Sequence, residues 1–428
     1  MKNKLYFFQT TEGKFVFDGD EVAVFQCDTN DDTRYSSEMI SPPVDNHRSH
    51  FFRTICLVLN NSCNLFCSYC YANKGVYDKP LAQMSYESAC SAIDMIAKSV
   101  ISHALSEMTI AFFGGEPLLS FNLIKHLVVY CETSYPFLVK KYQITTNGTL
   151  ITPDIAAFME KYNFNIMISI DGGEKVHNHY RCMRNGQGSY DAVVKGISHI
   201  NKKYLLNARM TITDVNSSFH TYIDSILSLG IKRITFAIDY QIPEKFFINY
   251  INSIKELTVK YINDIKNKKF YDITNLTRII SYIIFHNKCR THCNAGVSYV
   301  TLSADGKYYQ CPRFVGISKF CMGGDFKSVM EASERFKKKL KSSASERCKE
   351  CSKCCFVFIC GGVCLHHAYL HNGKIFDRIP TECMERETIA KEALNLLCSL
   401  NVEERRNFLL FLTSLWEKNN MKGGENNG

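Results

Sequence analysis

The feature that most constrains this chain is an alternation of strand and helix patterns from residue 54 to about residue 240. Short apolar runs typical of strands are each followed by a segment whose apolar residues recur at helical spacing. Six such units in series predict parallel strands joined by crossover helices, and they are too few to close an eight-unit barrel. The sequence therefore predicts an α/β fold, a partial (β/α)6 barrel of the TIM type, with its active site at the carboxyl ends of the strands. The strands are expected at 54–59, 108–113, 142–146, 165–170, 207–213 and 233–239, and the helices near 85–100, 121–132, 153–161, 190–203 and 218–229.

The segments on either side of this alternation have other patterns. Runs at 5–8 and 14–17 predict a β-hairpin, with a third strand at 22–25 and a polar linker at 28–50. Helices are predicted at 244–287 and 385–417. We expect five regions: a small β-rich region at 1–50, the barrel at 51–245, a helical bridge at 246–288, a cysteine-rich domain at 289–390, and a C-terminal helix and tail at 391–428.

Cysteine is unusually frequent, with 20 residues in 428, and 12 of them lie from Cys289 to Cys398. A chain of this length with 46% hydrophobic residues can bury its own core and needs few disulfides. The N-terminus lacks a signal-length apolar run, and no uncharged apolar stretch reaches the ~18 residues that cross a bilayer. We therefore expect a cytoplasmic protein without a membrane partner, whose clustered thiols bind metal.

The net charge of +9 is mild for a chain of this size. It suits an acidic peptide as partner, although a solvated basic surface explains it equally well. The chain has no basic stripe with interleaved aromatic residues. Nucleic acid is therefore not the expected partner.

A short cysteine motif, Cys63-x3-Cys67-x2-Cys70, follows the first predicted strand. Three closely spaced thiolates can hold three irons of a [4Fe–4S] cube and leave the fourth iron open, as a catalytic metal site requires. A zinc site and a group of core cysteines are the alternatives. The motif resembles that of the radical S-adenosylmethionine (radical SAM) family, including an aromatic residue, Tyr69, just before the third cysteine.

This resemblance implies a cofactor and a reaction. The open iron would bind S-adenosylmethionine, and reduction of the cluster would yield a 5′-deoxyadenosyl radical that abstracts hydrogen from a substrate. Gly114, Gly115 and Glu116 end the second strand and match the motif that holds the methionine amino group in the family, although a tight turn is the other interpretation. Ser169, at the end of the fourth strand, matches a polar residue that contacts the ribose. Tyr69 completes the expected cofactor-binding set.

A second cysteine pattern runs through the C-terminal third. Its intervals resemble the SPASM domain of radical SAM enzymes that act on peptides, with two auxiliary [4Fe–4S] clusters. The resemblance implies that Cys293, Cys311 and Cys364, with Cys289 as a candidate fourth ligand, hold the first auxiliary cluster. It implies that Cys351, Cys354, Cys360 and Cys383 hold the second. Cys351-x2-Cys354 is also an ordinary zinc half-site. Cys321, Cys348 and Cys355 are additional, so a shifted ligand choice stays open, and His366, His367 and His371 are interpreted as solvated loop residues.

The expected substrate is a peptide or protein. One activity is maturation of a ribosomally made peptide by a thioether, ether or carbon–carbon crosslink, and the other is formylglycine formation in a sulfatase. Sulfatase-maturing relatives place an Asp directly after the cysteine that corresponds to Cys311, where this chain has Pro312 and then Arg313. An arginine cannot serve as a base, so the crosslinking enzyme is preferred. The expected partners are a leader peptide, bound by residues 1–50, and a flavodoxin or ferredoxin as reductant. No catalytic residue is assigned. The non-enzymatic alternative is an iron–sulfur electron carrier.

Overall fold

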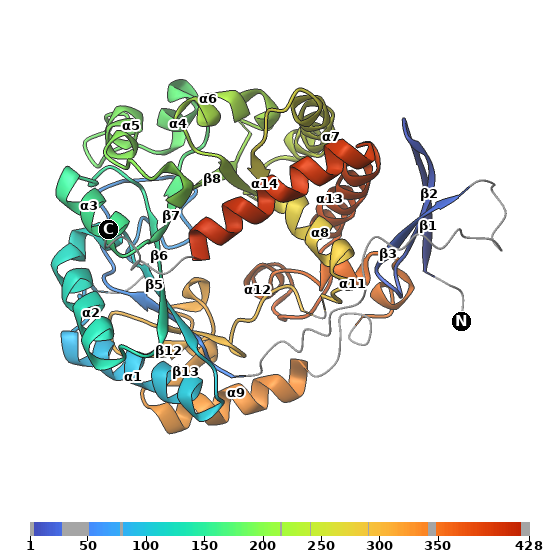
Figure 1. Ribbon diagram of the computed structural model, residues 1–428. Helices are drawn as coiled ribbons and strands as arrows, with labels where there is room; N and C mark the ends of the chain where they lie inside the picture. The colour runs from blue at the N-terminus through green and yellow to red at the C-terminus, as the bar shows by residue number, and fades with distance from the viewer. Residues whose placement is uncertain are drawn as a thin grey trace. The chain divides into compact units, whose positions relative to one another are not determined.

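The computed structural model describes residues 4–27, 51–77, 80–214, 216–239, 241–289, 291–340 and 348–420 (Figure 1). Its contacts divide the chain into two compact units. We call Ser49–Ile242, Asn294–Lys338 and Ser414–Gly428 the barrel unit, and Met1–Arg48, Pro243–Cys293 and Lys339–Thr413 the cysteine-rich unit. These units are defined by contacts, and the five regions expected from the sequence pattern stay predictions.

The barrel unit contains the six predicted parallel strands, each hydrogen-bonded to the next in chain order. The α/β partial barrel is therefore confirmed. The sheet continues past the first of these strands to a parallel strand and two antiparallel ones that the sequence did not reveal, because two to four residues are too short for a periodic pattern. In sheet order the strands are β9(Arg233–Ile238), β8(Leu206–Ile212), β7(Asn165–Ser169), β6(Val139–Thr146), β5(Glu107–Phe113), β4(Thr54–Val58), β11(Tyr299–Leu302), β12(Tyr308–Tyr309) and β13(Cys321–Gly323).

The helices of the barrel unit begin where the sequence provides caps. Ser85 accepts a hydrogen bond from the Ser88 backbone N–H, and Thr152 accepts one from that of Ile155, just before α1 and α3. Figure 1 shows α1, α2 and α3 beside the strands β5 and β6. The helices are α1(Tyr86–Ser102), α2(Phe121–Ser134), α3(Pro153–Lys161), α4(Glu174–Tyr180), α5(Tyr190–Ser198), α6(Ile223–Ser228) and α9(Phe326–Leu340), the last ending in the other unit, with 3₁₀ turns η1(Pro117–Ser120), η2(Lys203–Leu205), η3(Phe219–Tyr222), η4(Pro312–Phe314) and η5(Ser318–Phe320).

The core of the barrel unit follows the strand alternation. In β5 every second residue, Met108, Ile110 and Phe112, is buried, and the residues between them are half-buried. The Phe112 ring stacks on that of Phe164, the residue just before β7, with ring centres 5.9 Å apart. Apolar packing on one face therefore holds the strands in the register that aligns their carboxyl ends.

The cysteine-rich unit starts with the predicted hairpin and third strand, which pair antiparallel in the order β1–β2–β3. The prediction of a single helix at 244–287 is wrong. The first helix ends at residue 266, the chain turns at Lys268, which has φ 59°, and a short strand precedes the next helix. The linker expected at 28–50 lies outside the described residues. The elements are β1(Leu5–Thr10), β2(Gly13–Asp18), β3(Ala23–Cys27), α7(Glu244–Lys266), β10(Asp272–Ile273), α8(Thr274–Ile284), η6(Cys351–Lys353), α11(Val357–Cys360), α12(Leu365–Asn372) and α13(Pro380–Cys398).

The helix expected at 385–417 is two helices, since the chain breaks at residues 399–401 before α14(Val402–Asn420) begins. Within the cysteine-rich unit α13 packs against α7 and α8, and the Tyr250 hydroxyl of α7 donates to Glu385 of α13. Of the helices in the described residues, none combines the length and apolar character needed to cross a membrane.

Candidate functional site

The loop after β4 carries the first cysteine motif. Cys63, Cys67 and Cys70 are all half-buried there. We call residues 62–77 the cluster loop. Two backbone hydrogen bonds attach it to the end of α4 and the residues that follow: the Phe66 N–H donates to the Cys182 carbonyl at 2.8 Å, and the Ser68 N–H to that of Tyr180 at 3.3 Å. The three thiols are thus presented by a loop that is held in place, at the edge predicted for the active site.

The predicted glycines allow the next loop to approach the cluster loop closely. A Cβ on Gly115 would lie 2.0 Å from the Ser62 carbonyl oxygen, and one on Gly114 would lie 2.9 Å from that of Asn60. Gly75, in the cluster loop itself, has φ 90° and would meet Cys63 and Gly115 at 2.8 Å. These glycines therefore pack the two loops backbone to backbone. Contact of Gly114 and Gly115 with a cofactor stays a prediction.

Glu116 is buried beneath the cluster loop, with 1% of its surface exposed. Its carboxylate accepts hydrogen bonds from the Leu118 N–H at 3.0 Å, the Thr146 hydroxyl at 2.6 Å and the Asn147 N–H at 2.8 Å. Burial raises the pKa of Glu116 and these hydrogen bonds lower it. The carboxylate therefore joins the carboxyl ends of β5 and β6. Its expected contact with an amino group stays a prediction.

Tyr69 takes part in a charged network that the sequence did not reveal. Its hydroxyl donates to Asp171 and accepts from Arg181 Nη1 at 2.7 Å. The other oxygen of Asp171 accepts from the Thr211 N–H of β8 at 2.9 Å. Ser169 is the half-buried last residue of β7, two residues before Asp171, and its ribose contact stays a prediction. The only sequence signal for this network was the shared strand face of residues 169 and 171.

Arg181 is buried, with 7% of the residue exposed. Within the described part of the chain, its Nε has no hydrogen-bond partner. A buried guanidinium N–H is costly to leave unpaired. The donor set beside the cluster loop is therefore incomplete without a further acceptor.

The chemistry of the three thiols fits a bound iron–sulfur cluster. Burial raises the pKa of Cys63 to about 12 and also raises that of Cys67, which the charge of Arg181 lowers. A metal ion deprotonates a coordinating thiol outright. Iron would therefore bind these groups as thiolates, although burial alone keeps Cys63 and Cys67 protonated. In the described residues, no three Cys, His, Asp or Glu side chains converge on one metal ion. Each thiolate of a cube binds its own iron, so convergence on one point is not needed.

A second group of thiols surrounds a cavity of about 50 Å³ in the cysteine-rich unit. Cys351 and Cys360 face it with Cys383, and Cys354 interacts electrostatically with Cys383. The four thiols expected to hold the second auxiliary cluster are thus brought together. The additional Cys348 lines the same cavity and is hydrogen-bonded to Cys351. The cavity is also lined by Cys293, His292, Gly361 and Arg378.

The set expected for the first auxiliary cluster is divided between the two units. Cys289, Cys293 and Cys364 belong to the cysteine-rich unit and Cys311 to the barrel unit, so this ligand set stays a prediction. Cys289 is buried, and its thiol donates to the Thr291 carbonyl at 3.3 Å.

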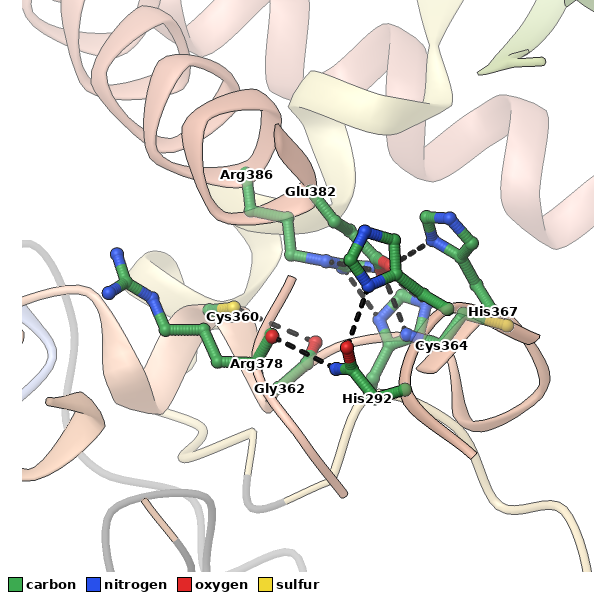
Figure 2. Close-up of polar contacts among 10 residues, drawn as sticks. His292, Cys360, Gly362, Cys364, His367, Arg378, Glu382 and Arg386 are labelled. Atoms are coloured by element: carbon green, nitrogen blue, oxygen red, sulfur yellow. Dashed lines mark hydrogen bonds and ion pairs between the residues drawn. The ribbon is translucent and has the colours of Figure 1, made fainter. Parts of the chain in front are cut away.

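The histidines after the last dense cysteine group differ from the expectation. His366, His367 and His371 lie on α12 and not in a loop. His366 is 6% exposed, and His367 Nδ1 is 2.8 Å from Glu382, so the interpretation as solvated residues is wrong for these two. Figure 2 shows Glu382 and Arg386 of α13 contacting His367, Cys364 and His292. Helical periodicity could not reveal this network, because its members are up to 94 residues apart.

Comparison with known proteins supplies the family. Residues 57–217 match the model of the radical SAM superfamily. An uncharacterized protein of Methanocaldococcus jannaschii is 31% identical over 270 residues, which are 62% of this chain and 86% of the relative. The radical SAM cyclopropyl synthase TigE of Paramaledivibacter caminithermalis is 27% identical over 54% of this chain and 45% of the relative. A cysteine-type anaerobic sulfatase-maturating enzyme of Clostridium novyi is 25% identical over 60% and 72%.

Two solved structures share the fold. Native anSMEcpe with bound AdoMet and Cp18Cys peptide has a TM-score of 0.67 at 20% identity, covering 80% of this chain and 96% of that one. Streptococcus suis SuiB bound to precursor peptide SuiA has a TM-score of 0.53 at 12% identity, covering 88% and 98%. Both are SPASM-type radical SAM structures, and the cysteine-rich C-terminal region is consistent with such a domain. Together with the three-cysteine loop at the strand ends, these findings show that the chain belongs to the radical SAM superfamily.

Proposed function

We propose that this protein is a peptide maturase that cleaves S-adenosylmethionine reductively and crosslinks a ribosomally made peptide through a thioether, ether or carbon–carbon bond. A [4Fe–4S] cluster on Cys63, Cys67 and Cys70 would supply the electron for that cleavage, which generates the 5′-deoxyadenosyl radical. Two auxiliary clusters in the cysteine-rich region would complete the cofactor set. The single observation that carries the proposal is the cluster loop, which presents three thiols next to an unpaired buried guanidinium N–H.

Residues around the cluster loop have defined tasks in this proposal. The Glu116 carboxylate holds Thr146 and the Asn147 backbone, and the Asn147 amide then lies 3.8 Å from the Cys63 sulfur. Arg181, beside Cys67, provides a donor for an anionic group of the cofactor. The barrel end is therefore organised to bind an anion and to keep the thiols at a constant spacing.

The choice of crosslinking over formylglycine formation rests on the residues after Cys311. Pro312 occupies the position of the expected base, and the Arg313 guanidinium lies 4.9 Å from the centre of the Tyr71 ring. A guanidinium stays protonated and cannot take a proton from a substrate thiol or hydroxyl. The likeness to a SuiB structure that holds a precursor peptide and to an anSMEcpe structure that holds a Cp18Cys peptide supports a peptide substrate. We propose a leader segment, a cytoplasmic location and a flavodoxin or ferredoxin donor on the same basis.

Formylglycine formation is the second candidate, because a cysteine-type sulfatase-maturating enzyme is among the relatives and anSMEcpe shares the fold. In that case another residue would have to act as the base. The unsubstituted protein, incubated with a cysteine-containing sulfatase peptide, separates the two activities. The expected result is no formylglycine.

The test uses protein purified and reconstituted without oxygen. With dithionite and S-adenosylmethionine we expect 5′-deoxyadenosine from the native chain and none from Cys63→Ala. Short cysteine-, serine- or threonine-rich peptides encoded beside the gene are then assayed by mass spectrometry for the loss of two hydrogens that a crosslink causes. Formylglycine in a sulfatase peptide, without any crosslinked product, would contradict the proposed chemistry. Absence of 5′-deoxyadenosine with the cluster present would favour an electron carrier.

A further inference from the structure

The clearest unassigned feature of the cysteine-rich unit is a buried ion pair on α13. Glu382 has none of its surface exposed. Its carboxylate accepts from Arg386 Nη2 at 2.6 Å and Nε at 3.1 Å, and it lies 2.8 Å from His367 Nδ1. It also accepts from the Cys364 backbone N–H at 2.7 Å (Figure 2). One carboxylate thus satisfies donors from two parts of the chain, Arg386 on its own helix and the start of α12.

Arg386 extends the network to the segment that carries Cys293. Its Nη1 lies 2.8 Å from His292 Nδ1, and its own side chain is 14% exposed. A guanidinium can only donate, so the His292 imidazole accepts this hydrogen bond. His292 is the residue before Cys293. A single guanidinium therefore connects α13 with the backbone next to a second predicted ligand.

The same guanidinium lies near the thiols of the other predicted set, because His292, which it contacts, lines the cavity with Cys360 and Cys383. Burial raises the pKa of Cys360 to about 11, and the charge of Arg386 is the largest influence that lowers it. Glu382 directly precedes Cys383 on α13. The ion pair therefore contacts the Cys364 backbone and the residue before Cys293, both expected on the first auxiliary cluster, and it influences Cys360 and directly precedes Cys383, both expected on the second.

We propose that Glu382 and Arg386 form a positioning bridge between the two auxiliary clusters, which sets the geometry of the first and the reduction potential of the second. The proposal rests on the proposed clusters. Its geometric part comes from the Cys364 N–H and His292 contacts, which orient two ligand-bearing segments. Its electrostatic part comes from one half-buried cation that contacts His292 in the wall of the cavity that Cys360 also lines. Reduction by one electron adds negative charge to a cluster, so a nearby cation favours the reduced state.

The two members of the pair then have effects of opposite sign. Arg386→Gln removes the cation and leaves the Glu382 charge, so the midpoint potential of the second auxiliary cluster should become more negative. Glu382→Gln removes the anion and leaves Arg386, so the potential should become more positive. Arg386→Lys keeps the charge but not the two-pronged hydrogen bonding, so it should stay near the native potential. A merely structural role gives no reason for opposite signs.

The experiment uses the full chain with Cys63, Cys67 and Cys70 replaced by alanine, so that only auxiliary clusters remain. These proteins are reconstituted without oxygen, and their iron and sulfide are counted. Each is then titrated with dithionite and redox mediators while the electron paramagnetic resonance signal of the one-electron-reduced clusters is followed. Lys260→Gln is the matched control, because it removes one positive charge from α7 in the same unit, where Lys260 pairs with Asp264 at 2.7 Å.

We expect a shift in opposite directions for Arg386→Gln and Glu382→Gln, and no shift for Lys260→Gln. Equal shifts in all three variants, or none in Arg386→Gln, would overturn the proposal while leaving the clusters intact. No iron in the triple-alanine background would refute the auxiliary clusters themselves, and the bridge with them. If Glu382→Gln does not fold, the difference between Arg386→Gln and Arg386→Lys decides the electrostatic part.

Discussion

The packing of Gly115 against the cluster loop leads to a sharp prediction. A Cβ at this position would lie 2.0 Å from the Ser62 carbonyl oxygen, 2.4 Å from its carbonyl carbon and 3.0 Å from its nitrogen. Real Cβ atoms essentially never approach within 3.0 Å, so Gly115→Ala must move the start of the cluster loop by about 1 Å. The obstacle is backbone and not a flexible side chain, so a change of rotamer cannot relieve it.

The consequence should be larger for catalysis than for the fold. Overpacking of this kind costs about 1–3 kcal/mol of stability, which a barrel of this size tolerates. A displacement of about 1 Å at a reacting centre, however, costs roughly 100-fold in rate. We therefore expect Gly115→Ala to fold, to bind less iron on Cys63, Cys67 and Cys70, and to form 5′-deoxyadenosine about 100-fold more slowly.

The assay compares this variant with Gly173→Ala. Gly173 precedes α4 with φ −72°, and a Cβ there meets only the Ser225 hydroxyl at 3.8 Å, so alanine fits without strain. Circular dichroism, iron content and 5′-deoxyadenosine formation are measured for both. If Gly115→Ala kept its iron and a rate within twofold of Gly173→Ala, the argument that loop packing controls the cluster would be refuted.

Three further outcomes follow from the described contacts. Burial lowers the pKa of His177 to about 2, so the folded protein keeps this imidazole neutral while the unfolded chain protonates it below a pKa of about 6.5. The free energy of unfolding should therefore fall as the pH drops below 6.5, by about 1.4 kcal/mol between pH 7.5 and pH 5.5. Urea unfolding at the two pH values measures this loss, which the variant His177→Asn should lack. Tyr69→Phe removes a donor from the buried Asp171 and should cost about 1–3 kcal/mol in the same assay, whereas Tyr86→Phe, with 41% of the residue exposed, should cost less; equal costs would contradict the Tyr69 network. Oxidation and chelation of the iron should make 348–383 sensitive to protease before the barrel strands, and simultaneous cleavage of both would show that the auxiliary clusters do not hold that segment.

Local sequence patterns predicted the frame of the barrel and the positions of the thiols. Strands and helices that alternate along the chain have their own periodicity, and α3 begins and ends at the predicted residues because Thr152, Pro153 and the turn after Lys161 are local signals. The Cys63, Cys67 and Cys70 spacing needed no tertiary information, since all three lie in one loop. The same holds for the hairpin of β1 and β2, whose turn is short and polar.

Contacts between distant segments were beyond the reach of such patterns. The short strand β11 beside β4 has no period of its own, and pairs only because residues 299–302 meet Thr54–Val58 in the folded chain. The helix expected at 244–287 is interrupted near Lys268. There the backbone adopts the left-handed conformation of a turn, although the helix propensity of the segment favours continuing the helix. In both cases the deciding interaction came from outside the window that periodicity samples.

The sequence by itself determined which chemistry this chain can support: an ordered series of parallel strands, three thiols after the first of them, and a cysteine spacing typical of auxiliary clusters. Only the tertiary structure decided which charged groups surround those thiols. Arg181 meets Tyr69 from 112 residues away, and Arg386 meets His292 from 94 residues away. Ligand spacing is a property of one segment, and so it can be read along the chain. Burial and pairing of charges depend on which segments meet, and this is settled only when the core excludes water and each buried charge must find a partner.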